Sequence, residues 1–498
     1  MSESRARVLL VDPPSVSPNE LNLGLASLAA VLRQDGHEVR VLDLNSWHVP
    51  GRISARLGAA LDWKPDVIGV SIFPACHLTY RGAANVLRRA RSRLGDRALL
   101  VCGGVGISIE PERAAARFAG LADLCVYGEG EATFCEIIRR RLAGEGFEGV
   151  PGTIHYDGAR PIVGPWRDFI RDLDSLPYPA YEAFDSVGGR LPEYPMMTSR
   201  GCPFNCVFCL NKTLTRRTFR WRSAGNVVDE IAYAKERFDF DALYIWDDHF
   251  SLRRERAEEI CRLIIERRLN ISYFLPDGIR ADSVTPEFAR LLKESGCRGV
   301  SIGFEDANPE TFRYIEKGEK YEDIVNAIHV LKAAGVPVRA SMVIGLPHTT
   351  YASTRVAMEN VAKLGIHAEW YLATPFPGTA FYDWVLENGR LLEDPLSQRA
   401  LTFRRVVFET PEFSRRERYR AFYEAFAYFS FPERAFYGKV CNPLTQQRSR
   451  VEKYIVSPFV VARYIPSRFP LHLWHLARDL ASALVRRARS SLRRVFGR

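Results

Sequence analysis

Three cysteines, Cys202, Cys206 and Cys209, stand close together in the spacing Cys-x3-Cys-x2-Cys. This spacing curls a loop so that three sulfur atoms can converge on one metal centre, and soft thiolates favour iron–sulfur clusters or zinc. Structural zinc sites take four protein ligands, but no fourth Cys or His lies nearby in the sequence. The motif therefore predicts a cluster with one open iron that can bind a small molecule. The alternative is a free or zinc-bound trio.

The residues around the triplet resemble the radical S-adenosylmethionine (SAM) superfamily. The motif follows a predicted strand, Tyr194–Ser199, and the aromatic Phe208 precedes its last cysteine. The resemblance implies that the three thiolates hold a 4Fe–4S cluster, and that the amino and carboxylate groups of SAM chelate the fourth iron. It also implies cleavage of SAM to methionine and a 5′-deoxyadenosyl radical, with electrons from an external donor of the flavodoxin or ferredoxin type.

Residues 1–150 alternate between strand and helix patterns with short turns. Strands are expected at Arg7–Asp12, His37–Asp43, Asp66–Ile72, Ala98–Cys102 and Asp123–Val126, with a helix near Leu23–Arg33. This alternation predicts an α/β fold with an open, Rossmann-like parallel sheet covered by helices on both faces. Ligands of such sheets bind at the carboxyl ends of the strands. Those ends carry Pro14, Ser71, Gly103, Gly104, Gly128 and Glu129.

This outline, followed by the triplet, resembles the cobalamin-binding domain of cobalamin-dependent radical SAM enzymes. The segments Val101–Gly104 and Val126–Glu131 are similar to motifs of that family. The resemblance implies that the six strand-end residues lie in a cobalamin site. The complete Asp-x-His-x-x-Gly motif, which supplies a histidine to cobalt in many cobalamin proteins, is absent from residues 1–150, whose histidines are His37, His48 and His77. Cobalamin is then expected base-off, with another side chain or water below cobalt.

Residues 151–192 are expected to form a linker, since Asp172–Pro179 is rich in proline and turn-forming residues. The alternation returns over residues 193–395, the expected radical SAM core. Strands are expected at Tyr194–Ser199, Ala242–Trp246, Ile271–Leu275, Gly299–Phe304, Val338–Ile344 and Trp370–Thr374. Intervening helices include Val227–Arg237, Ala257–Arg267, Pro286–Glu294 and Ile324–Ala334. Six strand–helix units predict a partial (β/α)6 barrel, with its chemistry at the carboxyl ends of the strands.

By resemblance, those strand ends supply the SAM site. Asp247 and Asp248 occupy the place of the Gly-Gly-Glu motif that holds the SAM ammonium, although a solvated acidic turn is the alternative. Glu305 is similar to the contact with the ribose or amino group, and a carboxylate suits hydroxyls or a cation. Ser341 or Arg339, which alternate on one strand, is expected at the SAM carboxylate, and Gly345 where the backbone approaches adenine. The expected SAM-binding residues are thus Phe208, Asp247, Asp248, Glu305, Ser341 and Gly345, and no catalytic side chain is assigned.

Residues 396–498 are expected to be mostly helical, with an aromatic helix at Arg415–Phe431 and a basic amphipathic helix at Leu471–Phe496. Residues 448–498 carry twelve Lys and Arg but only two acidic residues, which accounts for the whole net charge of +10. Since enzymes of nucleic acids more often have a basic catalytic body, we expect a small-molecule substrate and no nucleic acid. The basic helix is either a surface helix docked on the barrel or a peripheral membrane contact.

No apolar run reaches the roughly 20 residues of a membrane span, and the N-terminus leads straight into a strand without a signal-peptide pattern. Scattered single cysteines beside a cluster-forming triplet favour a reducing cytoplasm. Buried single thiols are expected at Cys76, Cys102, Cys125 and Cys135. The alternative is that they hold a second iron–sulfur cluster.

The resemblance implies a methyltransferase that moves a methyl group from methylcobalamin to an unactivated carbon. The neutral body and the aromatic C-terminal domain favour a natural-product or lipid intermediate as the substrate. One alternative is a cobalamin-dependent radical cyclase or rearrangement enzyme without methyl transfer. Another is a tRNA methylthiotransferase with a second cluster, and a third is a binding or scaffold protein whose cluster is structural. The substrate pocket is expected at the domain interface, between the strand ends of the sheet and the barrel.

Overall fold

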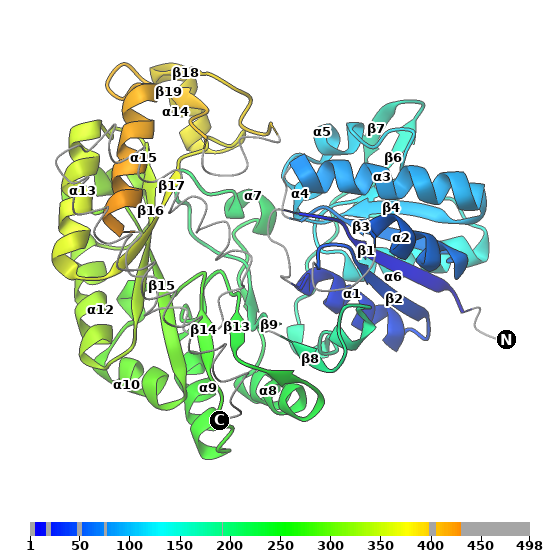
Figure 1. Ribbon diagram of the computed structural model, residues 1–498, viewed down its shortest axis with the longest axis horizontal. Coiled ribbons are helices and arrows are strands. Elements are labelled where there is room, and N and C mark those ends of the chain that lie inside the picture. Colours follow the sequence, from blue (N-terminus) through cyan, green and yellow to red (C-terminus); the bar gives the residue numbers. More distant parts are fainter. Residues whose placement is uncertain are drawn as a thin grey trace, which may run out of the picture.

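The computed structural model describes residues 5–15, 21–46, 52–73, 77–191, 193–397 and 405–429. They form two α/β bodies that lie side by side (Figure 1). The N-terminal body, blue to cyan, is built on a mainly parallel sheet, and the second body, green to orange, is built on a parallel sheet of its own. Figure 1 therefore shows the predicted arrangement of an open sheet followed by a partial barrel.

The first sheet has seven strands in the order β2-β1-β3-β4-β5-β6-β7. Its parallel part confirms the five predicted strands, which are β1 (Arg7–Asp12), β2 (Glu38–Asp43), β3 (Val67–Ser71), β4 (Leu99–Gly103) and β5 (Leu124–Val126). Helices α1 (Leu23–Gln34) and α6 (Glu131–Ala143) cover one face, and α2 (Ile53–Asp62), α3 (His77–Leu94) and α5 (Pro111–Ala116) cover the other. The strands are nearly continuous apolar runs because both faces are buried.

An antiparallel hairpin extends this sheet beyond residue 150. Strand β6 (Thr153–Asp157) pairs with β5, and β7 (Arg160–Val163) pairs with β6. The sequence placed these residues in the linker, which the structure corrects. The hairpin is short and its outer strand is largely exposed, so it lacks the buried apolar run that revealed the other strands.

The second sheet has six parallel strands in the order β17-β16-β15-β14-β13-β9. Their bounds are β9 (Tyr194–Met196), β13 (Leu243–Ile245), β14 (Tyr273–Leu275), β15 (Cys297–Glu305), β16 (Val338–Ile344) and β17 (His367–Leu372). Its main helices are α8 (Ala224–Arg237), α9 (Arg254–Glu266), α10 (Pro286–Glu294), α12 (Tyr321–Ala333), α13 (Tyr351–Leu364) and α14 (Ala380–Asn388). Because sequential strands are neighbours and helices line the outer side (Figure 1), the predicted partial barrel is confirmed.

Shorter elements complete the two bodies. Three two-stranded pairs join β8 (Arg190–Leu191) to β12 (Asp239–Phe240), β10 (Ser199–Arg200) to β11 (Arg220–Trp221) and β18 (Arg390–Leu391) to β19 (Phe408–Glu409). Short α-helices are α4 (Val105–Ser108), α7 (Asn211–Thr215) and α11 (Pro309–Phe312). The 3-10 turns are η1 (Gly95–Arg97), η2 (Leu173–Ser175), η3 (Tyr181–Ala183), η4 (Ala281–Ser283) and η5 (Arg313–Ile315).

Side-chain caps define where the barrel helices begin. Helix α10 starts with Thr285, whose hydroxyl accepts from a backbone N–H of the first turn, and Pro286 occupies the first helical position. Helix α13 starts with a capping box between Thr350 and Ser353 and ends at Gly365 in the left-handed conformation. These signals explain why the predicted helix bounds lie within a few residues of the observed ones.

The segment between the two sheets is packed into both. Ala180 donates its N–H to Ala26 of α1, and Asp185 donates its N–H to Val41 of β2. Tyr181 is fully buried, donates its hydroxyl to Pro195 of β9 at 2.7 Å and stacks edge-on against Tyr194. One apolar core therefore runs from α1 through this segment into the barrel.

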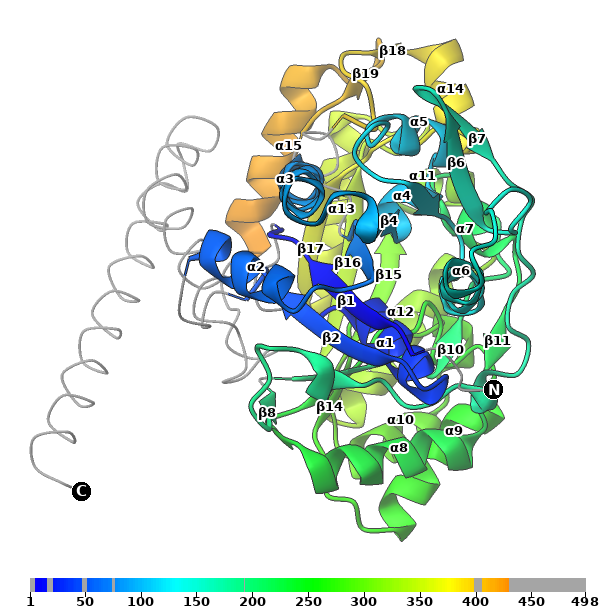
Figure 2. The same cartoon turned by 90° about the vertical axis from the view of Figure 1, so that its right-hand side faces the viewer.

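Helix α15 (Arg415–Phe429) confirms the predicted aromatic helix over its described part and packs against α13 and β17 (Figure 2). The predicted basic helix at Leu471–Phe496 lies outside the described residues. Within the described ranges, no helix combines the length and apolar character that crossing a membrane requires.

Candidate functional site

The cysteine loop begins directly after β10, above the carboxyl end of β9, where the barrel fold predicts the site. Gly201 has a φ of +90°, and a Cβ there would overlap the carbonyl of Thr218, so only glycine fits this turn. Its N–H donates to Asp248 at 3.1 Å. Further along the loop, Cys209 donates its N–H to the carbonyl of Cys206 at 3.1 Å. Backbone bonds thus fix the start and the end of the loop.

The three thiols of this loop lie in a buried, low-dielectric environment. Burial raises the pKa of Cys202, raises that of Cys206 to about 12 and raises that of Cys209 to about 11. Neighbouring thiols contribute to the shifts at Cys206 and Cys209, so the three groups are close enough to interact electrostatically. Such thiols stay protonated at neutral pH unless a metal compensates the thiolate charge.

The donor set fits a three-thiolate cluster, although the thiols are not gathered in coordination geometry. Across the described ranges, no group of three or more His, Cys, Asp or Glu side chains is arranged to hold a metal ion. The three cysteines share one loop, form no disulfide and match the soft ligands that iron–sulfur clusters use. The ligand roles of Cys202, Cys206 and Cys209 therefore stay predictions that the chemistry of the donors supports.

A buried lysine beside this loop was missed by the sequence analysis. Lys317 forms ion pairs with Glu305 at 3.4 Å and with Glu319 at 3.3 Å, and its ammonium donates to the carbonyl of Gly303. Burial would lower the pKa of Lys317, but the two carboxylates raise it above its ordinary value. Its positive charge lowers the pKa of Cys206. Lys317 lies in a loop after η5 and belongs to no motif, so its role could not be predicted from the sequence.

A second buried cation lies next to Lys317, because Arg280 donates to the carbonyl of Gly318 at 2.9 Å. The guanidinium of Arg280 lies 3.8 Å from the ring centroid of Phe204 within the cysteine motif and forms an ion pair with Asp282. The His249 ring packs edge-on against the same phenylalanine at 5.5 Å. Burial, followed by the charges of Lys317 and Arg280, lowers the pKa of His249 to about 3. Two buried cations thus lie beside the loop, which suits thiolate ligands.

We expect His249 to make the cofactor-free protein sensitive to acid. The folded state holds this imidazole neutral down to a pKa of about 3, whereas the unfolded chain protonates it near 6.5. Between these values the unfolded state binds the extra proton, so the free energy of unfolding falls as the pH falls, by on the order of 2–4 kcal/mol. Urea unfolding from pH 7 to pH 4 should be less pH-dependent in His249→Phe than in the wild type. The exposed His329 gives the control, because His329→Asn should change nothing.

The two aspartates after β13 accept hydrogen bonds from the residues around the cysteine loop, so they do not form a solvated acidic turn. Buried Asp247 accepts from the N–H of Thr198 at 2.5 Å, from the Thr198 hydroxyl and from the Ser199 hydroxyl at 2.7 Å. Asp248 accepts from Asn211 at 2.6 Å as well as from Gly201. These three hydrogen bonds leave one acceptor position on the Asp247 carboxylate, so its contact with the SAM ammonium stays a prediction. Asp248 is half-buried, and its SAM contact stays a prediction.

The other expected SAM residues lie on β15, on β16 and in the cysteine loop. Glu305 is the last residue of β15 and has a φ of +63°, and burial raises the pKa of its carboxyl. On β16, the Ser341 hydroxyl lies 3.2 Å from that of Ser301 on β15. Phe208 packs against the barrel core. Their roles toward SAM are not tested by these contacts.

Gly345 contacts protein where adenine was expected. The guanidinium of buried Arg418, from α15, donates to the Gly345 carbonyl at 3.1 Å and lies 4.0 Å from the Phe408 ring centroid. Gly345 has a φ of +97°, and a Cβ there would overlap that guanidinium. The glycine is therefore required by helix α15, which the sequence analysis did not connect to this turn.

We expect Gly345→Ala to be destabilising whether or not SAM binds. Positive φ alone costs an L-residue about 1–2 kcal/mol, and displacement of Arg418 adds to this cost. The free energy of unfolding from urea titration of the cofactor-free protein measures the effect. Gly225 on α8 has no neighbour at its Cβ position, so Gly225→Ala should stabilise the protein by up to about 1 kcal/mol. Equal effects of the two substitutions would contradict this account.

At the N-terminal sheet, a polar network joins the carboxyl ends of β1 and β3. Asn22 donates to Asp12 and to the hydroxyl of Ser71, both at 3.0 Å, and also caps α1. Pro14 follows β1 and lies against Gly82 of α3, where a Cβ would come within 3.0 Å of the proline ring. Ser71 and Pro14 are thus brought to one edge, as predicted.

Backbone conformation and close packing already explain why glycines occupy positions at this edge. Gly104 has a φ of +102°, and a Cβ there would lie 3.2 Å from the backbone of Ile72. Gly103 ends β4 and is half-buried. Gly128 has a φ of +77° and donates its N–H to the Ser108 hydroxyl at 3.0 Å. The cobalamin roles of the three glycines stay predictions, and their small size is compatible with a bulky ligand.

Glu129 does not present a free carboxylate to this edge. Its oxygens accept from Arg200 and Arg220 of the barrel body and from the N–H of Ile170. The side chain is thus engaged in an interdomain ion pair, and the cobalamin contact at this residue stays a prediction. The described histidine His37 precedes β2, at the opposite edge of the sheet, and cannot act as a lower cobalt ligand.

The described single cysteines do not assemble a second cluster. Cys102 and Cys125 are partners on β4 and β5 and are fully buried on the sheet face covered by α3. Cys135 of α6 packs against the core of the opposite face. Three thiols on two sides of a sheet cannot ligate one cluster, so the buried-thiol interpretation holds for them; Cys76 lies outside the described residues.

A cavity of about 980 Å³ lies along α3. Arg81, Arg88, Arg117 and Phe118 line it together with Ser397 from the segment that follows the barrel. None of its lining residues belongs to the cysteine loop or to the expected SAM site. The predicted substrate pocket between the two cofactor sites therefore stays a prediction.

Two family descriptions match the chain. Residues 15–138 match the B12 binding domain, and residues 196–361 match the radical SAM superfamily. The first match lies within the N-terminal sheet, and the second contains the cysteine loop and most of the barrel. The order of the two matches agrees with the order of the two sheets.

The chain is also similar to known proteins over most of its length. It is 29% identical over 397 residues to an uncharacterised methyltransferase of Pyrococcus horikoshii, covering 78% of this chain and 84% of the relative. It is 25% identical over 449 residues to the cytidylyl-2-hydroxyethylphosphonate methyltransferase of Streptomyces wedmorensis, covering 78% and 82%. The solved structure of the radical SAM methyltransferase TsrM from Kitasatospora setae matches with a TM-score of 0.62 at 22% identity, over 75% of this chain and 74% of that one. This last likeness establishes a shared fold.

Proposed function

Because the chain belongs to the radical SAM superfamily and carries a B12-binding domain, we propose that it is a cobalamin-dependent radical SAM methyltransferase. The observation that carries the proposal is the union of both domains in one chain whose relatives, at 29% and 25% identity, are methyltransferases. Its substrate is a small molecule, a natural-product or lipid intermediate that accepts a methyl group on an unactivated carbon.

Three thiolates, from Cys202, Cys206 and Cys209, would hold the 4Fe–4S cluster. When bound, the cluster and SAM supply a carbon radical, and cobalamin supplies the methyl group. The chain positions these groups: Asp247 and Asp248 fix the ends of the cysteine loop, and the carboxyl edge of the first sheet offers small residues to cobalamin. The buried cations Lys317 and Arg280 offset the negative charge of the thiolates.

Product analysis tests this function. Anaerobically reconstituted protein with cobalamin, SAM carrying a deuterated methyl group and a reductant would be incubated with candidate metabolites and analysed by mass spectrometry. Methyl transfer yields S-adenosylhomocysteine and 5′-deoxyadenosine together, with a deuterated methyl group on one metabolite. The cyclase or rearrangement alternative yields no stoichiometric S-adenosylhomocysteine. An absence of both products after reduction would favour a structural cluster.

Two further parts of the proposal concern partners. An external donor of the flavodoxin or ferredoxin type would reduce the cluster. The basic C-terminal helix would rest on anionic membrane, and liposome flotation of the protein truncated at residue 469 tests this contact. Flotation that is unchanged by the truncation would contradict it.

We also propose the division into a cobalamin-binding domain, a linker, a radical SAM core and a helical C-terminal region, with a cytoplasmic location.

A further inference from the structure

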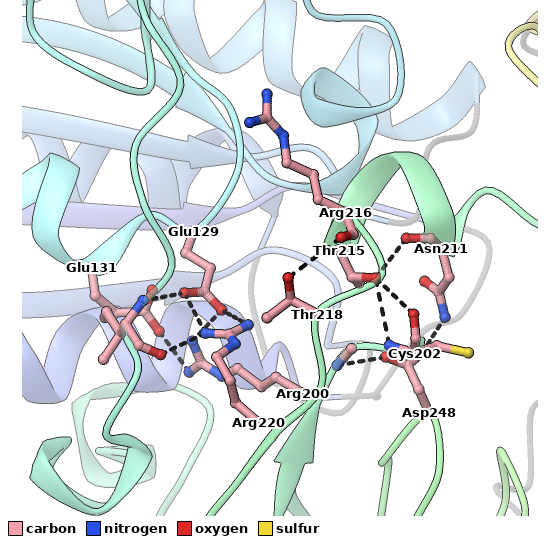
Figure 3. A network of polar contacts seen from close by, with 12 residues as sticks. Glu129, Glu131, Arg200, Cys202, Asn211, Thr215, Arg216, Thr218, Arg220 and Asp248 are labelled. Atoms are coloured by element: carbon pink, nitrogen blue, oxygen red, sulfur yellow. Dashed lines mark hydrogen bonds and ion pairs between the residues drawn. The ribbon is translucent and has the colours of Figure 1, made fainter. Parts of the chain in front are cut away.

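Four charged side chains join the N-terminal body to the cysteine loop (Figure 3). Arg200 donates to Glu129 at 3.2 Å and to Glu131 at 2.7 Å. Arg220 donates to both oxygens of Glu129, at 2.8 and 3.0 Å. The two glutamates come from the end of β5 and the start of α6, and the two arginines come from the paired strands β10 and β11. We call these four residues the interdomain clamp.

The clamp is shielded from solvent. The side chains of Arg220 and Glu131 are 8% and 9% exposed, and those of Arg200 and Glu129 are 19% and 18% exposed. Burial alone would raise the pKa of Glu129, but hydrogen bonds and charges from Arg220 and Arg200 bring it below its ordinary value. Paired, hydrogen-bonded charges in such a place favour one arrangement of the two bodies, because loss of one partner leaves the other charge buried and unpaired.

Aromatic contacts strengthen the same junction. The guanidinium of Arg216, at the end of α7, lies 4.0 Å from the Trp166 ring centroid, and that of Arg220 lies 4.5 Å from Phe169. Trp166 in turn packs edge-on against Tyr127, at the end of β5. The segment from Arg200 to Arg220 is therefore tied to the N-terminal body at three arginines.

That segment is the one that carries the cluster cysteines. Arg200 directly precedes Gly201 and Cys202, and Arg200 pairs with Arg220 in the register of β10 and β11. Inside the segment, the Thr215 hydroxyl donates to the carbonyl of Asn211 at 2.7 Å, and the Asn211 side chain donates to Asp248 (Figure 3). The cysteine loop is thus held between Asp248 on the barrel side and the clamp on the N-terminal side.

We propose that Glu129 and Glu131 are positioning residues, which hold the cysteine loop against the carboxyl edge of the N-terminal sheet and so set the spacing between the cluster and cobalamin. The inference rests on the proposed function only for the presence of both cofactors. Methyl transfer requires the reacting groups to be held at a defined distance. A looser clamp would therefore uncouple the two reactions, so that SAM is cleaved without a matching transfer of the methyl group. Neither glutamate contacts the cysteines in this arrangement, and each acts through an arginine.

The spacing can be measured without knowing the substrate. In holoenzyme prepared with a reduced 4Fe–4S cluster and cob(II)alamin, both centres are paramagnetic, and pulsed EPR measures their dipolar interaction. Glu129→Gln and the double variant Glu129→Gln/Glu131→Gln should shift and broaden the interspin distance distribution, measured in samples matched for iron and cobalt content. Glu136→Gln provides the matched control, because Glu136 lies on α6 and pairs with Arg140 and Arg167 within the N-terminal region.

Hydrogen exchange gives a second readout on the cofactor-free protein. Loss of a charge-assisted hydrogen bond should speed exchange in residues 199–222 about tenfold in Glu129→Gln and not in Glu136→Gln. Arg200→Lys covers the case in which the glutamate variants fail to fold. It keeps the charge but cannot bridge both glutamates in the same geometry, so it should broaden the distance distribution as well.

The outcomes separate the clamp from the proposed function. A distance distribution that is identical in the wild type, the double variant and Arg200→Lys would overturn the clamp even if the enzyme methylates a substrate. A distribution broadened in these variants and unchanged in Glu136→Gln would support it even if no methyl transfer is found. Equal broadening in Glu136→Gln would also overturn the inference, because it would mark a general loss of stability.

Discussion

Replacing Cys202, Cys206 and Cys209 together with alanine is expected to remove the iron from the anaerobically reconstituted protein and to abolish formation of 5′-deoxyadenosine. No other cysteine belongs to this loop, and a cluster without thiolate ligands has nothing to hold it. Iron content should fall from about four atoms per chain to background. Colorimetric iron analysis and chromatography of SAM cleavage products measure the two effects.

The matched control is Cys135→Ala, which removes a half-buried thiol from α6 in the N-terminal body. It should keep full iron content and full SAM cleavage. Iron and 5′-deoxyadenosine that both survive the triple substitution would refute the cluster assignment and, with it, the proposed function. Loss of iron and of SAM cleavage in Cys135→Ala would instead support the alternative that a cluster is bound in the N-terminal sheet.

Lys317→Met is expected to destabilise the protein strongly. The side chains of Lys317, Glu305 and Glu319 are only 10%, 14% and 1% exposed, so the substitution leaves two buried carboxylates without their shared cation. Breaking a buried ion pair by removing one partner costs about 3–5 kcal/mol. Urea unfolding of the cofactor-free protein at pH 7 measures the loss in the free energy of unfolding.

Two observations would show whether the loss of stability comes from the charges of Lys317, Glu305 and Glu319 or from their packing. The triple variant Lys317→Met/Glu305→Gln/Glu319→Gln removes the unpaired charges and should recover much of the lost stability. Burial already raises the pKa of Glu305 in the wild type, so in Lys317→Met the difference from the wild type should shrink as the pH falls and the carboxyls protonate. A loss that is independent of pH and not recovered in the triple variant would contradict the electrostatic account.

The sequence was informative where one local pattern decides the structure. Five strands of the first sheet and six of the barrel were predictable because most of them are rich in apolar residues and bounded by turn residues, and the cysteine loop was predictable from spacing alone. The hairpin of β6 and β7 was not, because its outer strand is exposed and lacks a buried apolar face.

Side-chain partners were the less predictable part of the site. Asp247 was correctly expected at a strand end, but its hydrogen bonds from Thr198 and Ser199 depend on β9 and β10, far away in the sequence. The partners of Glu129 likewise lie in the other body. Lys317 occupies a loop without a motif, and its importance follows only from two carboxylates that the fold brings to it. Long-range contacts of this kind leave no periodic trace in a single sequence.

The packed segment around Tyr181 limits how the two bodies can move. Hinge opening between domains needs a connection with few contacts, exposed to water and free to change its backbone angles. Here the connection shares its interior with both bodies and gives backbone hydrogen bonds to α1 and β2. Substrates and products would accordingly enter and leave by rearranging surface loops, while the halves of the molecule keep their relative orientation throughout a catalytic cycle.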